Sequence, residues 1–97
     1  MGLDYDPAKR AATLAERGAE RGLDFADADR LFSGIHATLP DDRMDYGERR
    51  YISAGFIADR LVVLVWTPRG TKRRIISMRY AHAKEAQIWA KHLGRGR

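Results

Sequence analysis

The sequence predicts a single α+β domain with two N-terminal helices, a mainly antiparallel four-stranded sheet and a C-terminal helix. Its 97 residues match the usual size of one domain, which we expect to span residues 1–97. Apolar residues recur at helical spacing before Gly34, and β-branched and aromatic residues alternate with polar ones after it. A last segment with helical spacing, residues 81–93, stops at Gly94.

Two helices are predicted before Gly34. Asp6 can cap the first, and Pro7 fits its first position, where the missing N–H costs nothing. This helix is expected to run from Pro7 towards Arg21, through a tandem repeat of Ala-Glu-Arg-Gly that adds about one turn. Asp24 can cap the second helix. Its helically spaced core residues are Phe25, Ala28, Leu31 and Phe32.

Four strands are predicted after Gly34, at residues 35–39, 49–57, 61–67 and 72–80. The turns between the last three strands are short enough for hairpins, which indicates an antiparallel meander. Residues 61–66 are apolar on both faces, so we expect this strand to lie in the centre of the sheet.

Alternation along the second and fourth predicted strands assigns side chains to the two faces of the sheet. The residues predicted to face the core are Ile52, Ala54, Phe56, Ile76 and Met78. The residues predicted on the open face are Arg49, Tyr51, Ser53, Arg73, Ile75, Ser77 and Arg79. Cations beside a ring are typical of RNA-binding surfaces, although a half-polar outer face is also ordinary for an antiparallel sheet.

The net charge of +5 is unevenly distributed along the chain. Residues 1–42 carry five bases and nine acids, a net charge of −4, whereas residues 43–97 carry thirteen bases and four acids, a net charge of +9. Most of the bases are Arg, which binds phosphate through two parallel hydrogen bonds. This asymmetry indicates that the C-terminal half meets a polyanion, for which RNA is our first choice.

Several classes of protein are excluded by composition. The chain has no Cys, and His36, His82 and His92 fall at no recognised ligand spacing, so we expect no metal and no other cofactor. The longest apolar run has six residues, against about 20 for a membrane span, so no membrane contact is expected. The first residues lack the features of a signal peptide, which predicts a cytoplasmic protein.

Four motifs follow one another along nearly the whole chain. They are residues 4–9 (Asp-Tyr-Asp-Pro-Ala-Lys), residues 42–43 with 46–49 (Asp-Arg and Tyr-Gly-Glu-Arg), residues 66–70 (Trp-Thr-Pro-Arg-Gly), and residues 74–79 with 81–85 (Arg-Ile-Ile-Ser-Met-Arg and Ala-His-Ala-Lys-Glu). Together they resemble the BrnT family, toxins of type II toxin–antitoxin modules. The resemblance implies a ribonuclease with a RelE-like fold that inhibits translation. It also implies neutralisation by a BrnA-like antitoxin, DNA contact only through that antitoxin, and a dimer of toxin–antitoxin heterodimers as one assembly to consider.

A metal-independent ribonuclease lets the RNA 2′-OH attack the adjacent phosphate, which requires a base, an acid and cations. The candidate catalytic residues are Glu48, Arg49, Arg79 and His82. Glu48 acts as the base or pairs with Arg49 to orient it, and both interpretations remain open. The candidate RNA-binding residues are Arg43, Tyr46, Tyr51, Arg69, Arg73, Arg74 and Lys84.

In a simple meander, Arg49 and Arg79 lie at opposite ends of the sheet, roughly 17–20 Å apart for strands of typical length. Either the site is an extended track with the scissile phosphate near Arg79 and His82, or one strand register differs. Two rival functions use the same basic face. One is a non-catalytic RNA-binding or adaptor domain, and the other is a structural subunit that docks an acidic partner.

Overall fold

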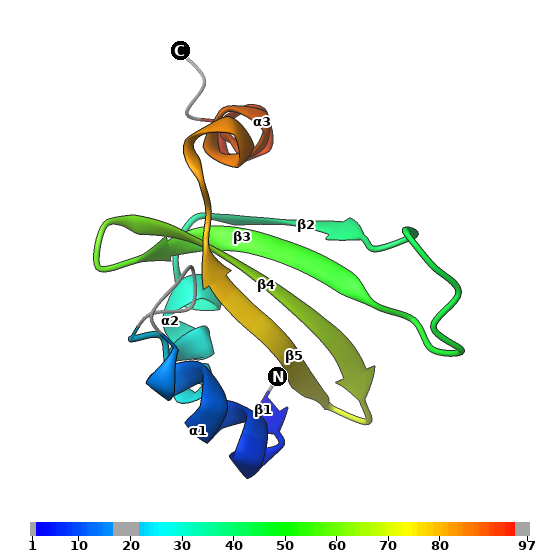
Figure 1. The fold of residues 1–97 in the computed structure, drawn as a ribbon. Coiled ribbons are helices and arrows are strands. Elements are labelled where there is room, and N and C mark those ends of the chain that lie inside the picture. Colours follow the sequence, from blue (N-terminus) through cyan, green and yellow to red (C-terminus); the bar gives the residue numbers. More distant parts are fainter. Residues whose placement is uncertain (1, 17–21, 95–97) are drawn as a thin grey trace.

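A computed structural model describes residues 2–16 and 22–94 of the chain. The elements, in order, are β1 (Gly2–Tyr5), α1 (Pro7–Ala15), the 3-10 helix η1 (Phe25–Asp27), α2 (Ala28–Ser33), β2 (His36–Pro40), β3 (Tyr51–Ile57), β4 (Arg60–Arg69), β5 (Lys72–Tyr80) and α3 (Ala83–Leu93). They form three layers, with α1 and α2 on one side of a single sheet and α3 on the other (Figure 1). None of the described helices is long and apolar enough to cross a membrane.

The sheet has five strands in the order β1-β5-β4-β3-β2, and it is mixed. The predicted four-stranded, mainly antiparallel architecture is therefore wrong. The missed strand, β1, pairs in parallel with β5, from Gly2 opposite Lys72 to Tyr5 opposite Ile75. Its sequence, Gly-Leu-Asp-Tyr, contains two residue types that strands disfavour, and its partner lies about 70 positions away, so no local signal marked it. The predicted central strand does lie in the middle, as β4.

The N-terminal helices are shorter than predicted. Asp6 caps α1 as expected, accepting a hydrogen bond from the Ala8 N–H, but α1 ends at Ala15. Most of the tandem repeat, residues 17–21, lies outside the described residues. Asp24 caps the 3-10 helix η1 instead of an α-helix, and α2 begins only at Ala28. The predicted second helix is thus a 3-10 turn followed by a six-residue helix.

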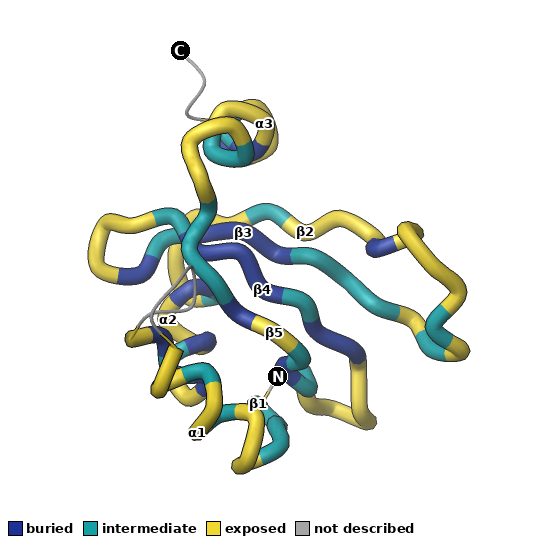
Figure 2. Tube along the Cα trace, viewed as in Figure 1, coloured by how far each residue is buried: buried dark blue, intermediate teal, exposed yellow. Residues whose placement is uncertain are grey.

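The main core lies between the sheet and the α2 side. Its buried residues are Leu23, Phe25, Ala28, Leu31, Ile57, Val62, Leu64, Trp66, Ile75 and Met78. Figure 2 shows how the two central strands, β3 and β4, remain buried along much of their length. Gly55 of β3 lets α2 pack closely on the sheet, because a Cβ atom at this position would lie 2.8 Å from the Cγ atom of Leu31 in α2.

A smaller second core lies between the sheet and α3. Ala54 and Val63 contact Trp89 and Leu93 there, with Ile52, Phe56 and Leu61 at the margin. Residues 52, 54 and 56 were predicted to face the core, and this is the core they face. The face predicted to be open carries the larger core instead, since Ser53 is fully buried and bonded to the Trp66 indole. Both faces are covered because helices pack on each.

An irregularity in β5 changes which side chains share a face. Val65 of β4 pairs with Ser77 and Trp66 pairs with Ile75, so β5 carries one extra residue, Ile76, at this point. As a result Ile75 joins the main core, whereas Ser77 and Arg79 lie on the α3 side. Alternation had placed these three residues with Arg73 on one face. A single extra residue therefore invalidates that prediction.

Candidate functional site

A cavity of about 170 Å³ opens on the α3 side of the sheet, beyond the small core. We call it the Arg43–Arg79 cavity, after the two arginines that line it. The other lining residues are Ile52, Val63, Val65, Ser77, Glu85 and Trp89. Its apolar lining comes from β3, β4 and Trp89 of α3. Its polar groups come from three separate segments, the loop before β3, strand β5 and helix α3.

Arg79 is bound by Glu85 at the wall of this cavity. The Nη1 and Nη2 atoms of Arg79 lie 2.5 Å from the two carboxylate oxygens of Glu85, a two-point contact. The hydrogen bonds from Arg79 hold the pKa of the Glu85 carboxyl below its usual value, although burial acts in the opposite direction. Glu85 is therefore ionised at neutral pH and fixes the plane of the Arg79 guanidinium.

His82 is the N-cap residue of α3. Its Nδ1 atom accepts a hydrogen bond of 3.4 Å from the Glu85 N–H, and the Glu85 side chain in turn accepts from the His82 N–H, which completes a capping box. The other ring nitrogen, Nε2, lies 3.4 Å from Glu85 Oε1, and the side chain is 69% exposed. A solvent-accessible imidazole thus stands beside the Arg79–Glu85 pair.

Arg43 reaches the cavity from the loop between β2 and β3. Its Nε and Nη2 atoms donate to the two oxygens of Asp41 at 2.7 and 2.8 Å, and the Tyr46 hydroxyl donates to the same carboxylate at 3.3 Å. The Asp41 side chain is fully buried, whereas that of Arg43 is 64% exposed. Hydrogen bonding by Arg43 lowers the pKa of Asp41 and raises that of Arg43, so the pair stays ionised.

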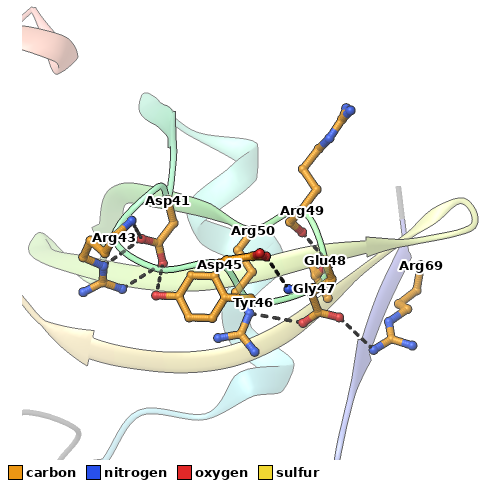
Figure 3. A network of polar contacts seen from close by, with 10 residues as sticks. Asp41, Arg43, Asp45, Tyr46, Gly47, Glu48, Arg49, Arg50 and Arg69 are labelled. Carbon is orange, nitrogen blue, oxygen red and sulfur yellow. Dashed lines mark hydrogen bonds and ion pairs between the residues drawn. The ribbon is translucent and has the colours of Figure 1, made fainter.

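A second cavity, of about 290 Å³, lies within the loop itself, and we call it the loop cavity. Glu48 lines it and pairs with Arg50 at 3.1 Å and with Arg69 at 3.4 Å (Figure 3). The Arg50 guanidinium stacks 4.0 Å from the centroid of the Tyr46 ring. Glu48 therefore does not orient Arg49, which was one of the two predicted interpretations.

Arg49 is exposed, and its side chain points away from this network (Figure 3). Among the described residues, its guanidinium has no hydrogen-bond or ionic partner, while its carbonyl accepts from the Thr67 hydroxyl at 2.6 Å. On β4, Thr67 marks the position of Arg49, and Val63 pairs with Arg79. These two β4 residues are four positions apart, which is roughly 13 Å along a strand. Arg49 and Arg79 thus line different cavities, as the predicted meander implied.

The remaining predicted contacts are distributed over both sides of the sheet. Tyr51 stacks on Trp66 with ring centroids 4.9 Å apart, on the main-core side. The Arg73 guanidinium lies 3.9 Å from the Phe32 ring centroid, and that of Arg74 pairs with Asp4 of β1 at 2.7 Å. Lys84 is exposed in the first turn of α3. Tyr51, Arg73 and Arg74 therefore make structural contacts in this state.

Two carboxylates at the site were missed by sequence reasoning: Glu85, which lines the Arg43–Arg79 cavity, and Asp41, which lines the loop cavity and binds Arg43. Glu85 was seen only as a neighbour of His82, although His82 and Glu85 stand at the spacing of a capping box and could have been joined by it. Asp41 followed Pro40 in what looked like an ordinary loop, and no pattern marks a carboxylate that becomes buried. The described residues contain no group of three or more His, Asp or Glu side chains placed to hold a metal ion.

A protein-family model matches most of this chain. The model described as "Ribonuclease toxin, BrnT, of type II toxin-antitoxin system" matches residues 5–85, from the end of β1 to the first turn of α3. The chain belongs to the BrnT family. Both arginines of the cavity, His82 and Glu85 all fall within the matched residues. No curated protein and no solved structure gave a significant match.

Membership of the BrnT family gives the chain its general function, a ribonuclease toxin of a type II toxin–antitoxin system. The substrate class is RNA, and the partner is an antitoxin protein. Both agree with the basic C-terminal half, since polyanionic RNA and a neutralising protein are partners that such a surface can bind.

Proposed function

We propose that this BrnT-family chain is a metal-independent endoribonuclease whose scissile phosphate binds in the Arg43–Arg79 cavity. The observation that carries the proposal is the convergence of two guanidinium groups on one cavity, next to an exposed imidazole and an ionised carboxylate. Arg is suited to this task because its planar fork matches the geometry of a phosphate. The two cations supply positive charge where a phosphorane would accumulate negative charge.

The proposed reaction is transesterification within the RNA. The 2′-oxygen attacks the adjacent phosphorus and loses its proton to a base, while the bond to the 5′-oxygen breaks and that oxygen takes a proton from an acid. The products carry a 2′,3′-cyclic phosphate and a 5′-hydroxyl. Arg43 and Arg79 hold the phosphate and stabilise the pentavalent transition state.

His82 is our proposed general acid, because an exposed imidazole beside the cavity can donate a proton to the leaving oxygen. Glu85 replaces Glu48 as the proposed base, because Glu85 lines the Arg43–Arg79 cavity whereas Glu48 lines the loop cavity. Its lowered pKa keeps it in the proton-accepting form, and its contact with Arg79 fixes the cation.

The loop cavity is proposed to bind the neighbouring part of the RNA chain. Arg49 is exposed there with no partner among the described side chains, which suits a contact with a flanking phosphate. Arg50 covers one face of the Tyr46 ring, and the other face is proposed to stack on a base. Exposed Arg69 adds positive charge beside Glu48, and exposed Lys84, next to Glu85, adds it beside the Arg43–Arg79 cavity. We assign Glu48, Tyr51, Arg73 and Arg74 supporting roles, in which they hold the loop and the sheet.

In the cell, cleavage of RNA by this chain would inhibit translation, and a BrnA-like antitoxin would neutralise it. An antitoxin that covers the Arg43–Arg79 cavity would block RNA access directly. DNA contact would then come through the antitoxin, and pairing of two heterodimers would match a palindromic operator.

The direct test uses purified protein with a labelled RNA in excess EDTA, beside the same sequence in DNA. We expect cleavage of the RNA alone, with 2′,3′-cyclic phosphate ends. If RNA binds and is never cleaved, with or without divalent cations, the chain acts as a non-catalytic RNA-binding domain. If cleavage requires a divalent cation, the proposed metal independence is wrong.

A further inference from the structure

Asp41 lines the loop cavity and binds Arg43, which lines the Arg43–Arg79 cavity. Its backbone N–H donates to the Arg50 carbonyl at 2.9 Å, which continues the β2–β3 ladder by one step beyond Pro40 and Tyr51. Its carboxylate is fully buried. The main chain of Asp41 is thus fixed by the sheet, and its side chain points into the loop (Figure 3).

The two side chains that bind this carboxylate line different cavities. Arg43 occupies both carboxylate oxygens and lines the Arg43–Arg79 cavity. Tyr46 donates its hydroxyl to Oδ2 and lines the loop cavity. One anchored carboxylate therefore sets the positions of a phosphate-binding cation and of an aromatic ring at the same time.

Burial of the Asp41 carboxylate is not required to close the loop. A buried carboxylate is unfavourable unless hydrogen bonds compensate it, and a polar side chain open to water would close the same turn without that cost. Without Asp41, the long and mostly exposed Arg43 side chain would populate many rotamers. The contact exchanges this freedom for one fixed orientation, which is what binding a phosphate at a defined distance from Arg79 requires.

We infer that Asp41 is a positioning residue that holds Arg43 against the scissile phosphate and Tyr46 against the neighbouring nucleobase. This inference rests on the proposed function. It assigns to the loop a binding site for two successive nucleotides, a phosphate and the base beside it. Stacking on a tyrosine ring tolerates any base, so this site sets the register of the RNA and not its sequence.

The test compares Asp41→Asn with Asp59→Asn, which makes the same change of charge. Asp59 is exposed in the β3–β4 turn with a φ of 64°, a conformation that Asn tolerates well, and it lines neither cavity. Each variant is also combined with Arg43→Ala. Two quantities are measured in EDTA, the single-turnover cleavage rate and the dissociation constant for a 2′-O-methyl RNA that cannot be cleaved.

We expect Asp41→Asn to slow cleavage about tenfold relative to Asp59→Asn and to weaken RNA binding about threefold, despite equal net charge. In the Arg43→Ala background, Asp41→Asn should not slow cleavage further, because its effect on the rate passes through Arg43, and it should weaken RNA binding only by the roughly twofold share that passes through Tyr46. Tyr46→Phe, which removes only the hydroxyl, should weaken binding about twofold in the wild-type chain and not in Asp41→Asn.

Additive effects of Asp41→Asn and Arg43→Ala on the cleavage rate would overturn the inference, as would equal behaviour of Asp41→Asn and Asp59→Asn. If Asp41→Asn does not fold, Tyr46→Phe decides the question, because wild-type affinity for RNA in this variant would overturn the inference. Failure of the proposed function is a separate outcome. A wild-type chain that binds RNA without cleaving it would sink the ribonuclease mechanism, while the binding measurements would still test Asp41.

Discussion

Arg43 and Arg79 line the same cavity although one belongs to the loop before β3 and the other to the last strand of the sheet. Each is held by its own carboxylate, Asp41 for Arg43 and Glu85 for Arg79. Asp41 accepts from the Nε and Nη2 atoms of Arg43, and Glu85 accepts from the Nη1 and Nη2 atoms of Arg79, so each carboxylate fixes the plane of its guanidinium group. A phosphate between them would meet two oriented cations.

The salt dependence of RNA binding should report both arginines. Arg43→Ala and Arg79→Ala should each reduce the slope of log affinity against log salt concentration by about 0.7, the value for one phosphate contact on a single strand. Arg30→Ala is the matched control, because Arg30 is exposed on α2, on the opposite side of the sheet from α3. Titrations of a 2′-O-methyl RNA at several salt concentrations measure the slope. Equal slopes for all three variants would show that neither arginine contacts phosphate.

His82→Asn should separate catalysis from helix capping. Asn is among the best N-cap residues, so α3 should keep its cap and the melting temperature should change little. Loss of the imidazole should slow cleavage by about 10²-fold or more if His82 is the general acid. Cleavage rates and thermal melts of the two proteins check this. A variant that cleaves RNA at the wild-type rate would remove His82 from the mechanism.

Glu85→Gln should change how stability depends on pH. The pKa of Glu85 is lowered in the folded protein below its usual value of 4.5, so the ionised group stabilises the fold above pH 4.5, and this contribution is lost as the pH falls through the folded pKa. At pH 7 the variant should lose on the order of 1 kcal/mol, a figure reduced for the partial exposure of the pair. Gln still fits the capping box.

The difference in free energy of unfolding between wild type and Glu85→Gln should therefore shrink as the pH falls below 4.5. Denaturant titrations between pH 7 and pH 3 measure it. A difference that stays constant over this range would mean that the ion pair with Arg79 does not contribute to stability.

Gly55→Ala should test the packing of α2 on the sheet. The added Cβ would lie 2.8 Å from Leu31 Cγ and 3.0 Å from His36 Cβ, closer than packed atoms tolerate. The free energy of unfolding should fall by about 1–3 kcal/mol. Gly2→Ala is the control, since its Cβ would meet only the Lys72 side chain, at ordinary distances of 3.7 Å from Cγ and 4.0 Å from Cε. Equal stability of the two variants would contradict the described packing.

Sequence patterns located four strands and the C-terminal helix because those elements depend on local periodicity. β5 occupies Lys72–Tyr80, the predicted range. The strand that was missed, β1, owes its position to β5 and to the Asp4–Arg74 ion pair, both far away in the sequence. A segment that forms a strand only by pairing with a distant strand has no local sequence pattern that predicts it.

The composition of the site was harder to predict than its general character. Residues 43–97 were expected to meet a polyanion, and the family assignment confirms RNA as the substrate class. The extra residue in β5 determines which arginines line the same cavity. It places Arg79 on the α3 side of the sheet and Arg73 against Phe32 on the other side. Asp41 joined the site only because the loop folds back and buries it.

The single-turnover cleavage rate of RNA in EDTA, at saturating protein, tests whether the Arg43–Arg79 cavity is the phosphate site. Saturation removes differences in affinity, so the rate reports the free energy of the transition state relative to the bound complex. We predict that Arg43→Ala and Arg79→Ala each slow this step by about 10²-fold or more, while Arg30→Ala cleaves like the wild type. Cleavage by Arg79→Ala at the wild-type rate would contradict the assignment of the Arg43–Arg79 cavity as the phosphate site.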